Sequence, residues 1–439
     1  MDKNEIIAIL EDWNFWKKDL PIGIERPDYL SRLKNYLTTD QVIVITGTRR
    51  AGKSYIMRQL VKTLISEGRD ARETLFINFE DPRFTGLDAK TLQRIFEVYQ
   101  EVVRPAGIPV VFLDEIQEVE GWEKWVRSIQ ELGKAKVIIS GSNARLLSGE
   151  LSTLLTGRRL NLVVFPLSFR EFLSFKGLEV KEELDLIAER IKIQGMFREY
   201  LDFGSFPEVV LAQEKRQILL NYYEDVLYKD LVKRYRIKKI QELKSLARFY
   251  FSNVANLITY NSMKKFLGLA TDTVEKFSLY FQNAYLLFFL TRFSYKVREQ
   301  ERSPRKVYAV DSGLASVAGF QVSQNVGRMA ENLVFLELER RVLSTANLEI
   351  YYWKDPQHRE VDFIVKRGQK PEELIQVCWN PMARNKTRDR EIKAMFKAAT
   401  ELKLEKCVIL NEDYEGEEKI NGIVARYIPL WKWFSPVEV

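Results

Sequence analysis

Histidine and cysteine are scarce in this chain of 439 residues. The single histidine, His358, argues against a zinc site built on imidazole ligands. The two cysteines, Cys378 and Cys407, argue against a disulfide framework and suit a reducing environment. We therefore expect a cytoplasmic protein whose chemistry depends on other side chains.

Long apolar runs and a large charge excess are also missing. No uninterrupted apolar segment approaches the roughly 18 residues of a membrane span, and the N-terminal MDKNEIIAILEDW carries acidic residues inside its apolar stretch, unlike a secretory signal. The 68 basic and 61 acidic residues leave a net charge of +7, which is compatible with a polyanionic partner but does not demand one. We expect no membrane partner.

A phosphate-binding pattern is present near the N-terminus. Residues 41–54 read QVIVITGTRRAGKS, a β-branched apolar run followed at once by Gly47-x-x-x-x-Gly52-Lys53-Ser54. A helix is predicted directly afterwards, over Tyr55–Ile65, so that strand, loop and helix all occur in the required order. The alternative, a chance glycine-rich turn ahead of a helix, has no reason to show this complete order.

The residue types of this loop suit a nucleotide. Gly47 and Gly52 let the backbone turn so that successive N–H groups point at a phosphate, and the new helix adds its free N–H groups. Lys53 can reach the β- and γ-phosphates, and the Ser54 hydroxyl can bind Mg²⁺. The expected ATP-binding residues are Gly47, Thr48, Arg49, Arg50, Ala51, Gly52, Lys53, Ser54 and Tyr55.

Short apolar strands alternate with helical stretches as far as about residue 165. Such alternation predicts an α/β fold with a parallel sheet and helices on both faces. Two further helices are predicted ahead of this core, over Glu5–Trp16 and Arg26–Leu37. The strand candidates are Gln41–Thr46, Glu73–Phe79, Pro109–Leu113, Lys136–Ser140 and Asn161–Phe165.

An acidic pair ends one of these strands. The segment VVFLDEIQ places Asp114 and Glu115 at the end of an apolar strand, which is the Walker B arrangement. In P-loop ATPases the first acid holds Mg²⁺ and a following glutamate can activate the attacking water. We assign Asp114 to the metal and Glu115 to the general base; an acidic strand end that faces solvent is the alternative.

Polar residues follow the next two strands. Ser142 and Asn143 come after KVIIS, at the position where AAA+ ATPases have a sensor residue, and Asn143 or Ser142 can orient the water. Their alternative role is to cap the following helix. Arg158 and Arg159 precede a strand and are candidates for action across a subunit boundary, which would require a homo-oligomer; a structural salt bridge or a solvated pair is the alternative.

Several of these segments together resemble one family. They are GTRRAGKS, FINFEDPRF, VVFLDEIQEVEGWEKWV, IISGSNARLL, TGRRLNLVVFPLSFREF and YLDFGSFPEVV. The chain resembles, over nearly its whole length, a predicted AAA+ ATPase family of archaea and bacteria. Its members join the ATPase to a winged helix and a C-terminal domain that resembles restriction endonucleases. The resemblance implies ATP hydrolysis with Mg²⁺, and it leaves the cellular task open.

The middle of the chain suits a DNA-binding module. Helices are predicted over Gln241–Leu257 and Ser262–Leu267, and a capping box at Asp272-x-x-Glu275 opens a third helix. Strands over Phe288–Phe293 and Val307–Val310 would form a wing.

The predicted wing is basic. Between Thr291 and Lys306 there are six basic and two acidic residues, and Arg298–Lys306 is expected to be a charged loop along DNA phosphates. Lys264, Lys265 and Lys276 can add to this face. The alternative is a winged helix that only packs between domains.

The C-terminal part carries a possible second metal site. The restriction-endonuclease-like pattern is met by Glu331 on a helix, Asp362 on a strand and Gln376 on the next strand. Acids in this pattern bind Mg²⁺, which activates water. Cys378 occupies the position of the usual lysine, and Lys366 and Lys386 are the candidates to supply it from elsewhere in the chain. An active nuclease and a degenerate binding or architectural domain both remain open.

These patterns predict four domains. They are a P-loop AAA+ core over 1–167, a helical lid or linker over 168–238, a winged helix over 239–312 and a restriction-endonuclease-like domain over 313–439. The predicted function is Mg²⁺-dependent hydrolysis of ATP to ADP and phosphate, coupled to DNA binding or remodelling. The alternatives are an ATP-gated nuclease and a nucleotide-switched protein-interaction scaffold in signalling or defence.

Overall fold

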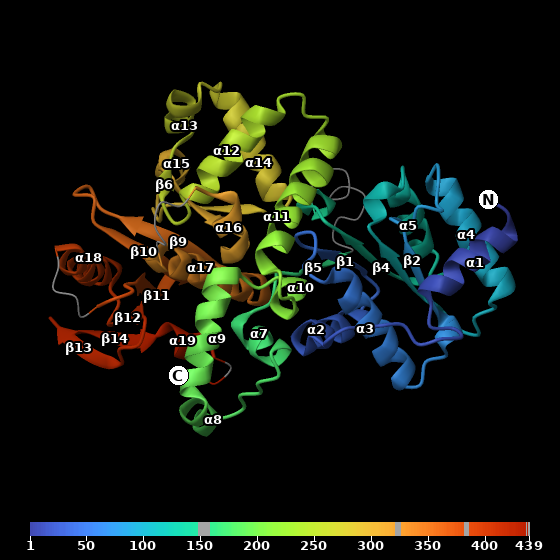
Figure 1. Cartoon of the computed structure of the whole chain (residues 1–439), viewed down its shortest axis with the longest axis horizontal. Helices are drawn as coiled ribbons and strands as arrows, with labels where there is room; N and C mark the ends of the chain where they lie inside the picture. Colours follow the sequence, from blue (N-terminus) through green and yellow to red (C-terminus); the bar gives the residue numbers. More distant parts are fainter. Residues whose placement is uncertain (148–158, 321–325, 382–385, 436, 438–439) are drawn as a thin grey trace. The chain divides into compact units, whose positions relative to one another are not determined.

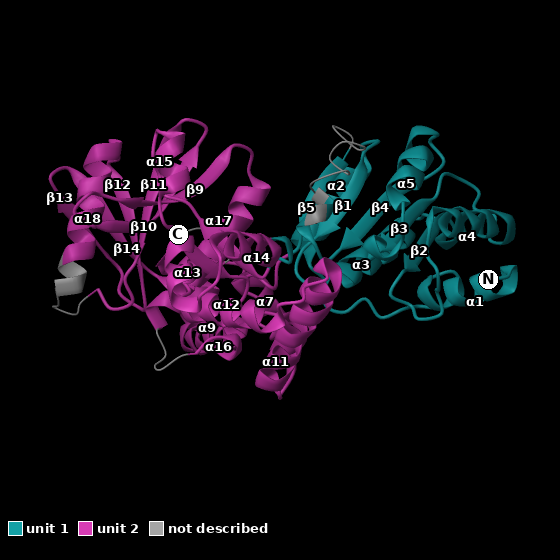
Figure 2. Cartoon of the chain, turned by 90° about the horizontal axis from the view of Figure 1, so that it is seen from above, with its two compact units in different colours: residues 1–164, 283–285 teal, residues 165–282, 286–439 magenta. Residues whose placement is uncertain are grey.

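The computed structural model describes residues 1–147, 159–320, 326–381, 386–435 and 437 (Figure 1). The chain folds as two units, one formed by residues 1–164 with 283–285 and the other by residues 165–282 with 286–439 (Figure 2). None of the described helices is long and apolar enough to cross a membrane.

A parallel sheet forms the centre of the first unit. Its five strands lie in the order β2-β3-β4-β1-β5, and every neighbouring pair is parallel. Their carboxyl ends therefore meet at one edge of the sheet, where α/β proteins bind ligands. The predicted α/β fold is confirmed. The strands are β1 (Val42–Thr46), β2 (Thr74–Asn78), β3 (Val110–Asp114), β4 (Lys136–Gly141) and β5 (Arg159–Val163).

Apolar clusters cover both faces of this sheet. Val42 and Val44 of β1 belong to one cluster, and Ile43 and Ile45 belong to the other. Burial of both faces is why β1 to β4 are nearly continuous apolar runs, whereas the edge strand β5 is partly exposed. The helices and short turns of this unit are α1 (Lys3–Trp13), α2 (Pro27–Leu37), α3 (Lys53–Ser66), η1 (Ala71–Glu73), α4 (Ala89–Val102), η2 (Ile116–Glu118), α5 (Trp122–Glu131) and η3 (Ala144–Leu147).

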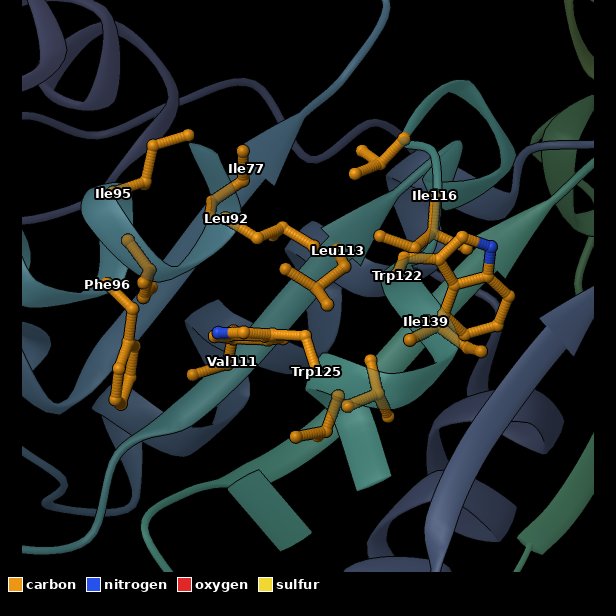
Figure 3. Close-up of a cluster of buried hydrophobic side chains, with 14 of the residues drawn as sticks. Ile77, Leu92, Ile95, Phe96, Val111, Leu113, Ile116, Trp122, Trp125 and Ile139 are labelled. Carbon is orange, nitrogen blue, oxygen red and sulfur yellow. The ribbon is translucent and has the colours of Figure 1, made fainter. Parts of the chain in front are cut away.

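Aromatic side chains of α5 complete the first cluster. Figure 3 shows Leu113 of β3 and Ile139 of β4 among Trp122 and Trp125 of α5. This packing fixes the ends of β3 and β4, from which the acidic pair and the polar residues of the site extend.

The second unit begins with helices, as the sequence predicted. Gly204 follows α9 with φ +74, and a Cβ atom there would lie 2.0 Å from Asp311 Oδ1. Asp311 Oδ2 accepts a hydrogen bond from the Ser205 N–H at 2.6 Å. The FGSFP sequence at residues 203–207 is therefore a turn that packs against the distant segment around Asp311. The helices are α7 (Phe169–Phe175), α8 (Glu183–Ala188), α9 (Arg190–Phe203), α10 (Pro207–Leu211), α11 (Lys215–Asp225) and the π-helix η4 (Val226–Lys233).

Four helices and a three-stranded antiparallel sheet, in the order β6-β8-β7, form the middle of the chain (Figure 1). Two local predictions were wrong. Asp272 lies inside α14 rather than capping it, and the capping box belongs to α13 through Thr259 and Ser262. The expected loop over Arg298–Lys306 contains a helix and the start of a strand. The elements are α12 (Ile240–Ser252), β6 (Leu257–Ile258), α13 (Tyr260–Leu267), α14 (Thr271–Asn283), β7 (Leu287–Leu290), α15 (Val297–Arg302) and β8 (Arg305–Ala309).

A mixed six-stranded sheet ends the chain, in the order β13-β14-β12-β11-β10-β9. Asp362 and Gln376 lie on the neighbouring strands β10 and β11, as predicted, and β13 and β14 form a hairpin that was not predicted. β13 is short, polar and at the edge, so its apolar pattern is weak. The elements are α16 (Ser312–Ala318), α17 (Val326–Ser344), β9 (Leu348–Lys354), β10 (Glu360–Arg367), β11 (Lys370–Val377), α18 (Lys386–Leu402), β12 (Lys406–Asn411), β13 (Gly416–Ile420), β14 (Ile423–Pro429) and α19 (Leu430–Trp433).

Candidate nucleotide-binding site

The loop between β1 and α3 has the backbone that its glycines predict. Gly47 has φ +141, and a Cβ atom there would lie 2.0 Å from the Val164 carbonyl oxygen. Gly52 has φ +97 and precedes α3 directly. Arg50, which is not glycine, also has a positive φ of 68°. The loop therefore needs its first glycine for space and holds a strained residue at its tip.

Lys53 is buried beneath this loop. Its ammonium donates hydrogen bonds to the carbonyls of Gly47 at 3.0 Å and Thr48 at 3.1 Å. The same nitrogen lies 3.9 Å from Glu115 Oε1, and its side chain is 4% exposed. The lysine and the acidic strand end are thus brought together across the sheet edge.

The first acid of the pair is tied to two hydroxyl groups. Asp114 ends β3 and is buried, and Ser140 of β4 donates a hydrogen bond to its Oδ1. The Ser54 side chain also hydrogen-bonds to Asp114. Burial, together with the neighbouring Glu115 charge, raises the pKa of Asp114 above its usual range. A cation beside Asp114 would therefore stabilise its ionised form.

The second acid is held in an unusual backbone conformation. Glu115 has φ 55° and ψ 47°, the left-handed region that non-glycine residues rarely adopt. Gln117 donates a hydrogen bond from Nε2 to the Glu115 carboxylate. Gln117 was not predicted as a site residue, although its place in the DEIQ motif was a visible signal. Strain of this kind is concentrated at functional sites, where surrounding contacts fix a reactive side chain.

The polar residues after β4 reach the same edge. β4 lies between β1 and β3, as predicted, with Gly141 paired to Thr46. Ser142 and Asn143 follow directly and are buried, and the Asn143 carbonyl accepts the Leu146 N–H at 3.2 Å. The side chain that would orient water thus belongs to the strand between the P-loop strand and the acidic strand.

Of the two arginine candidates, Arg159 lies within the described residues. Arg158 lies outside the described residues. Arg159 begins β5 and is paired with Val42, at the other end of β1 from the P-loop, and it donates a hydrogen bond to the Leu146 carbonyl at 3.3 Å. Its backbone is therefore distant from the P-loop of its own chain.

Comparison with known proteins adds the family. An AAA domain model matches residues 39–173, and two domains of unknown function, DUF8612 and DUF4143, match residues 194–324 and 326–433. An uncharacterized protein of Methanocaldococcus jannaschii is 35% identical over 411 residues, which cover 90% of this chain and 89% of that protein. The chain belongs to its family.

Two further similarities complete the comparison. An uncharacterized protein of Haemophilus influenzae is 31% identical over 421 residues, 93% of this chain and 98% of that protein. The solved structure of the Walker-type ATPase PABY2304 of Pyrococcus abyssi aligns with a TM-score of 0.41 and 13% identity, over 67% of this chain and 95% of that one. The AAA domain match over residues 39–173 agrees with the predicted P-loop AAA+ core in this part of the chain.

Three P-loop residues of the AAA domain lie at its surface or rim. Arg49 forms an ion pair with Glu80 at 2.7 Å. Arg50 is exposed. The Tyr55 side chain is 47% exposed, and its ring is so close to Gly23 that a Cβ atom there would lie 3.0 Å away. The segment around Gly23 is therefore next to the start of α3.

A clamp that sequence reasoning missed holds this segment. Gln59 of α3 donates hydrogen bonds from Nε2 to the carbonyls of Ile22 at 2.9 Å and Ile24 at 2.8 Å, and it accepts the Arg26 N–H at 3.3 Å. The Arg26 guanidinium donates to the Ala51 carbonyl at 2.8 Å. Partners 25 to 37 positions apart leave no local pattern, so the sequence offered no signal for the clamp.

We expect Gln59→Met to lower the free energy of unfolding of the AAA domain by about 1–2 kcal/mol, because two carbonyls lose their donor. Thermal and urea unfolding measure the loss. Ser66→Ala, at an exposed position on the same helix, is the matched control and should stay within about 0.5 kcal/mol. Equal stability of the two variants would contradict a structural role for the clamp.

A residue from far along the chain also reaches the P-loop strand. Residues 283–285 belong to the first unit, and the Tyr285 hydroxyl lies 2.8 Å from Thr46 Oγ1. Both side chains are buried, and burial raises the pKa of Tyr285 to about 12. The hydroxyl is therefore neutral, and it contacts the residue that precedes Gly47. No sequence signal pointed to this contact.

The C-terminal domain brings its three predicted residues together. Gln376 donates a hydrogen bond to Asp362 Oδ2 at 2.8 Å, and Lys306 of β8 contacts both Asp362 at 2.8 Å and Glu331 at 2.9 Å. Lys306 was predicted only as part of the exposed wing, and this was wrong because its side chain is 1% exposed.

Of the two alternative lysines, Lys366 has a side chain that the structure describes. Lys366 forms an ion pair with Glu349 of β9 instead, so the suggestion that it enters the acid cluster was wrong. The side chain of Lys386 lies outside the description. Cys378 follows β11 and is buried in the apolar cluster of this domain.

Proposed function

We propose that the chain is a Mg²⁺-dependent ATPase that hydrolyses ATP to ADP and phosphate. The observation that carries the proposal is the meeting of the P-loop lysine and the acidic strand end, with Lys53 Nζ 3.9 Å from the Glu115 carboxylate and Asp114 beside it. A cation donor for phosphate, a buried acid and a second acid for water are the parts that phosphoryl transfer requires.

The residues present suit the metal. Ser54 and Asp114 offer the oxygen ligands that Mg²⁺ prefers, and a hydrogen bond between their side chains already holds the hydroxyl and the carboxylate together. When bound with ATP, Mg²⁺ supplies neutralisation of phosphate charge. Lys53 adds a second positive charge to the same phosphates.

The remaining roles follow from the chemistry of each group. The amides of residues 47–55 hold the phosphates, Glu115 accepts the proton of the attacking water, and Asn143 orients that water by hydrogen bonding. Glu115 has a strained backbone conformation at the buried end of β3. The hydrogen bond from Gln117 fixes its side chain. ATPase measurement on the full chain with Mg²⁺ or EDTA tests the proposal, and an absence of Mg²⁺-dependent phosphate release would refute it.

We propose further that the protein is a cytoplasmic homo-oligomer in which Arg158 or Arg159 acts on ATP in a neighbouring subunit. The supporting observation concerns Arg159, whose backbone pairs with Val42 at the far end of β1 from its own P-loop.

We also propose that the middle module is a winged helix that binds DNA by charge, without sequence preference. The order α12, β6, α13, α14, β7, β8 supports this reading. Exposed basic residues lie on this module, namely Lys264, Lys265, Lys276, Arg298 and Arg302. Lys306 is buried and adds no charge to the surface of this module. Arg305 is half-buried and forms an ion pair with Glu301 at 3.3 Å. The wing is therefore less basic than the sequence suggested.

We expect the double variant Arg298→Gln, Arg302→Gln to weaken DNA binding, because two phosphate contacts are lost. The slope of log K against log salt should fall by about 1 for each arginine. Fluorescence anisotropy with two unrelated duplexes over a salt series measures this. The matched control replaces Arg94 and Lys134, which are exposed on the AAA domain, and should leave binding unchanged.

Two results would redirect the proposal. If the wing variant and the control bind alike, the basic surface of the middle module is not the DNA contact. If the full chain binds no DNA and its ATPase rate ignores DNA, the nucleotide-switched protein scaffold becomes the better reading.

A further inference from the structure

A buried ammonium group lies at the centre of the acid cluster in the second unit. Lys306 Nζ contacts Glu331 Oε1 at 2.9 Å, Glu360 Oε1 at 2.8 Å and Asp362 Oδ1 at 2.8 Å. An ammonium has three N–H donors, and three carboxylates surround this one. Every donor therefore has a carboxyl oxygen as its acceptor, although the side chain is only 1% exposed.

The second carboxyl oxygen of Asp362 is occupied by neutral donors. Asp362 Oδ2 accepts hydrogen bonds from Gln376 Nε2 at 2.8 Å and from the Val377 N–H at 3.0 Å. The orientation of the Gln376 amide is unambiguous, because its oxygen accepts the Asp362 N–H at 3.3 Å and its nitrogen must then face the carboxylate. Gln376 thus presents a donor, and not an oxygen ligand, to the centre of the cluster.

The lysine is fixed by the strand that carries it. Two residues along β8 from Lys306, the Tyr308 hydroxyl donates to Glu331 Oε1 at 2.7 Å, and its ring stacks on Phe335 with 4.2 Å between centroids. The Ala309 backbone forms two hydrogen bonds with the Asn332 side chain, at 2.8 and 3.0 Å. These contacts bind β8 to α17, so the ammonium position is set by packed backbone and not by a flexible stem.

The position of the missing lysine brings a further carboxyl group and no ammonium group. Glu391 of α18 hydrogen-bonds to Cys378, and burial together with the Asp362 charge raises the pKa of Glu391 to about 7. The cluster would be strongly repulsive without a cation at its centre. The Lys306 charge opposes the rise in the pKa of Glu391. Burial alone would lower the pKa of Lys306, but the charges of Asp362 and Glu331 raise it above its usual value.

We propose that Lys306 is the resident cation of this cluster and takes the place that a divalent metal ion would need among Glu331, Asp362 and Glu360. The C-terminal domain is then a metal-excluding domain, joined by this ammonium to the sheet of the middle module. Hydrolysis of DNA by Mg²⁺-activated water does not take place there. This inference is independent of the proposed ATPase activity, because the two sites lie in different units.

The first experiment uses the full chain with Asp114→Asn, which removes the acid of the proposed ATP-linked metal site, and Mn²⁺ as the probe. Electron paramagnetic resonance of free Mn²⁺ should show no binding that depends on Asp362. The same titration with Asp362→Asn added provides the comparison. Mn²⁺ bound to the protein with intact Asp362, and lost in the variant, would overturn the proposal.

The second experiment removes the lysine. Lys306→Met should lower the melting temperature by roughly 5–10 °C, because buried carboxylates lose their counter-ion. Mn²⁺ should bind this variant and restore part of the loss, and Asp362→Asn should abolish that binding. A folded Lys306→Met protein that does not bind Mn²⁺ would contradict the proposal.

A matched lysine controls for the substitution itself. Lys354 also contacts Glu360, at 3.5 Å, but its side chain is 22% exposed at the edge of the cluster. Lys354→Met should therefore change the melting temperature little and should bind no Mn²⁺ at this site. If Lys306→Met does not fold, the Mn²⁺ titration of the chain with intact Lys306 still decides the question.

Discussion

Glu115→Gln is expected to slow ATP hydrolysis by about 10²-fold or more while ATP binding stays nearly unchanged. An amide has the shape of the carboxylate and keeps hydrogen-bonding capacity toward Gln117, but it cannot accept a proton from water. The lysine 3.9 Å away loses one charged neighbour, which should favour phosphate binding. Single-turnover hydrolysis and calorimetric ATP titration measure the two effects separately.

Two variants frame this result. Lys53→Ala should weaken ATP binding itself, because the loop loses its phosphate cation. Glu118→Gln, at an exposed position three residues further on, removes the same charge outside the site and should hydrolyse ATP at the parent rate. If Glu115→Gln also hydrolysed at the parent rate, the base would have to be another group.

The parallel sheet was predictable because its strands are buried on both faces. Burial of that kind selects runs of apolar residues such as VIVIT in β1, and the run itself gives the bounds within a residue or two. The hairpin of β13 and β14 was not predicted, since an edge strand such as GEEKI needs few apolar residues. Asp272 was misplaced for a related reason, because acids are favoured both at the cap and in the first turn of a helix.

The P-loop and the acidic pair were predictable because their chemistry is local in sequence. Their supports were not, since each support comes from a distant segment. Gln59 reaches a carbonyl 37 positions away, and Tyr285 reaches a hydroxyl 239 positions away. Lys306 is the clearest case: it ends a basic stretch in which Arg298 and Arg302 are exposed, but its pairing partners lie on α17 and β10.

The position of Lys306 also bears on the three candidate functions. Because Lys306 is buried, the wing has less positive surface charge with which to bind DNA phosphates. The DNA proposal therefore depends on exposed residues such as Arg298 and Arg302. The same lysine, placed among the acids, disfavours the ATP-gated nuclease. ATP hydrolysis is unaffected by either point, because its residues belong to the first unit.

The second large effect concerns the paired arginines. If one of them acts across a subunit boundary, Arg158→Ala or Arg159→Ala should slow hydrolysis by about 10³-fold or more, since the charge of the transferring phosphoryl group loses its partner. ATP binding should change little. Arg170→Ala, at an exposed position on α7, is the matched control and should hydrolyse ATP at the parent rate.

Mixed oligomers distinguish action across the boundary from action within one chain. When an inactive arginine variant is mixed with an equal amount of Lys53→Ala, each arginine-deficient subunit keeps an intact ATP pocket and each Lys53→Ala subunit supplies the missing arginine. Random assembly pairs them productively at about a quarter of all interfaces, so hydrolysis should return to about a quarter of the parent rate. No recovery in oligomers that native mass spectrometry shows to be mixed would mean that the arginine acts within its own chain. The pairing of Arg159 with the start of β1 would then have only a structural role.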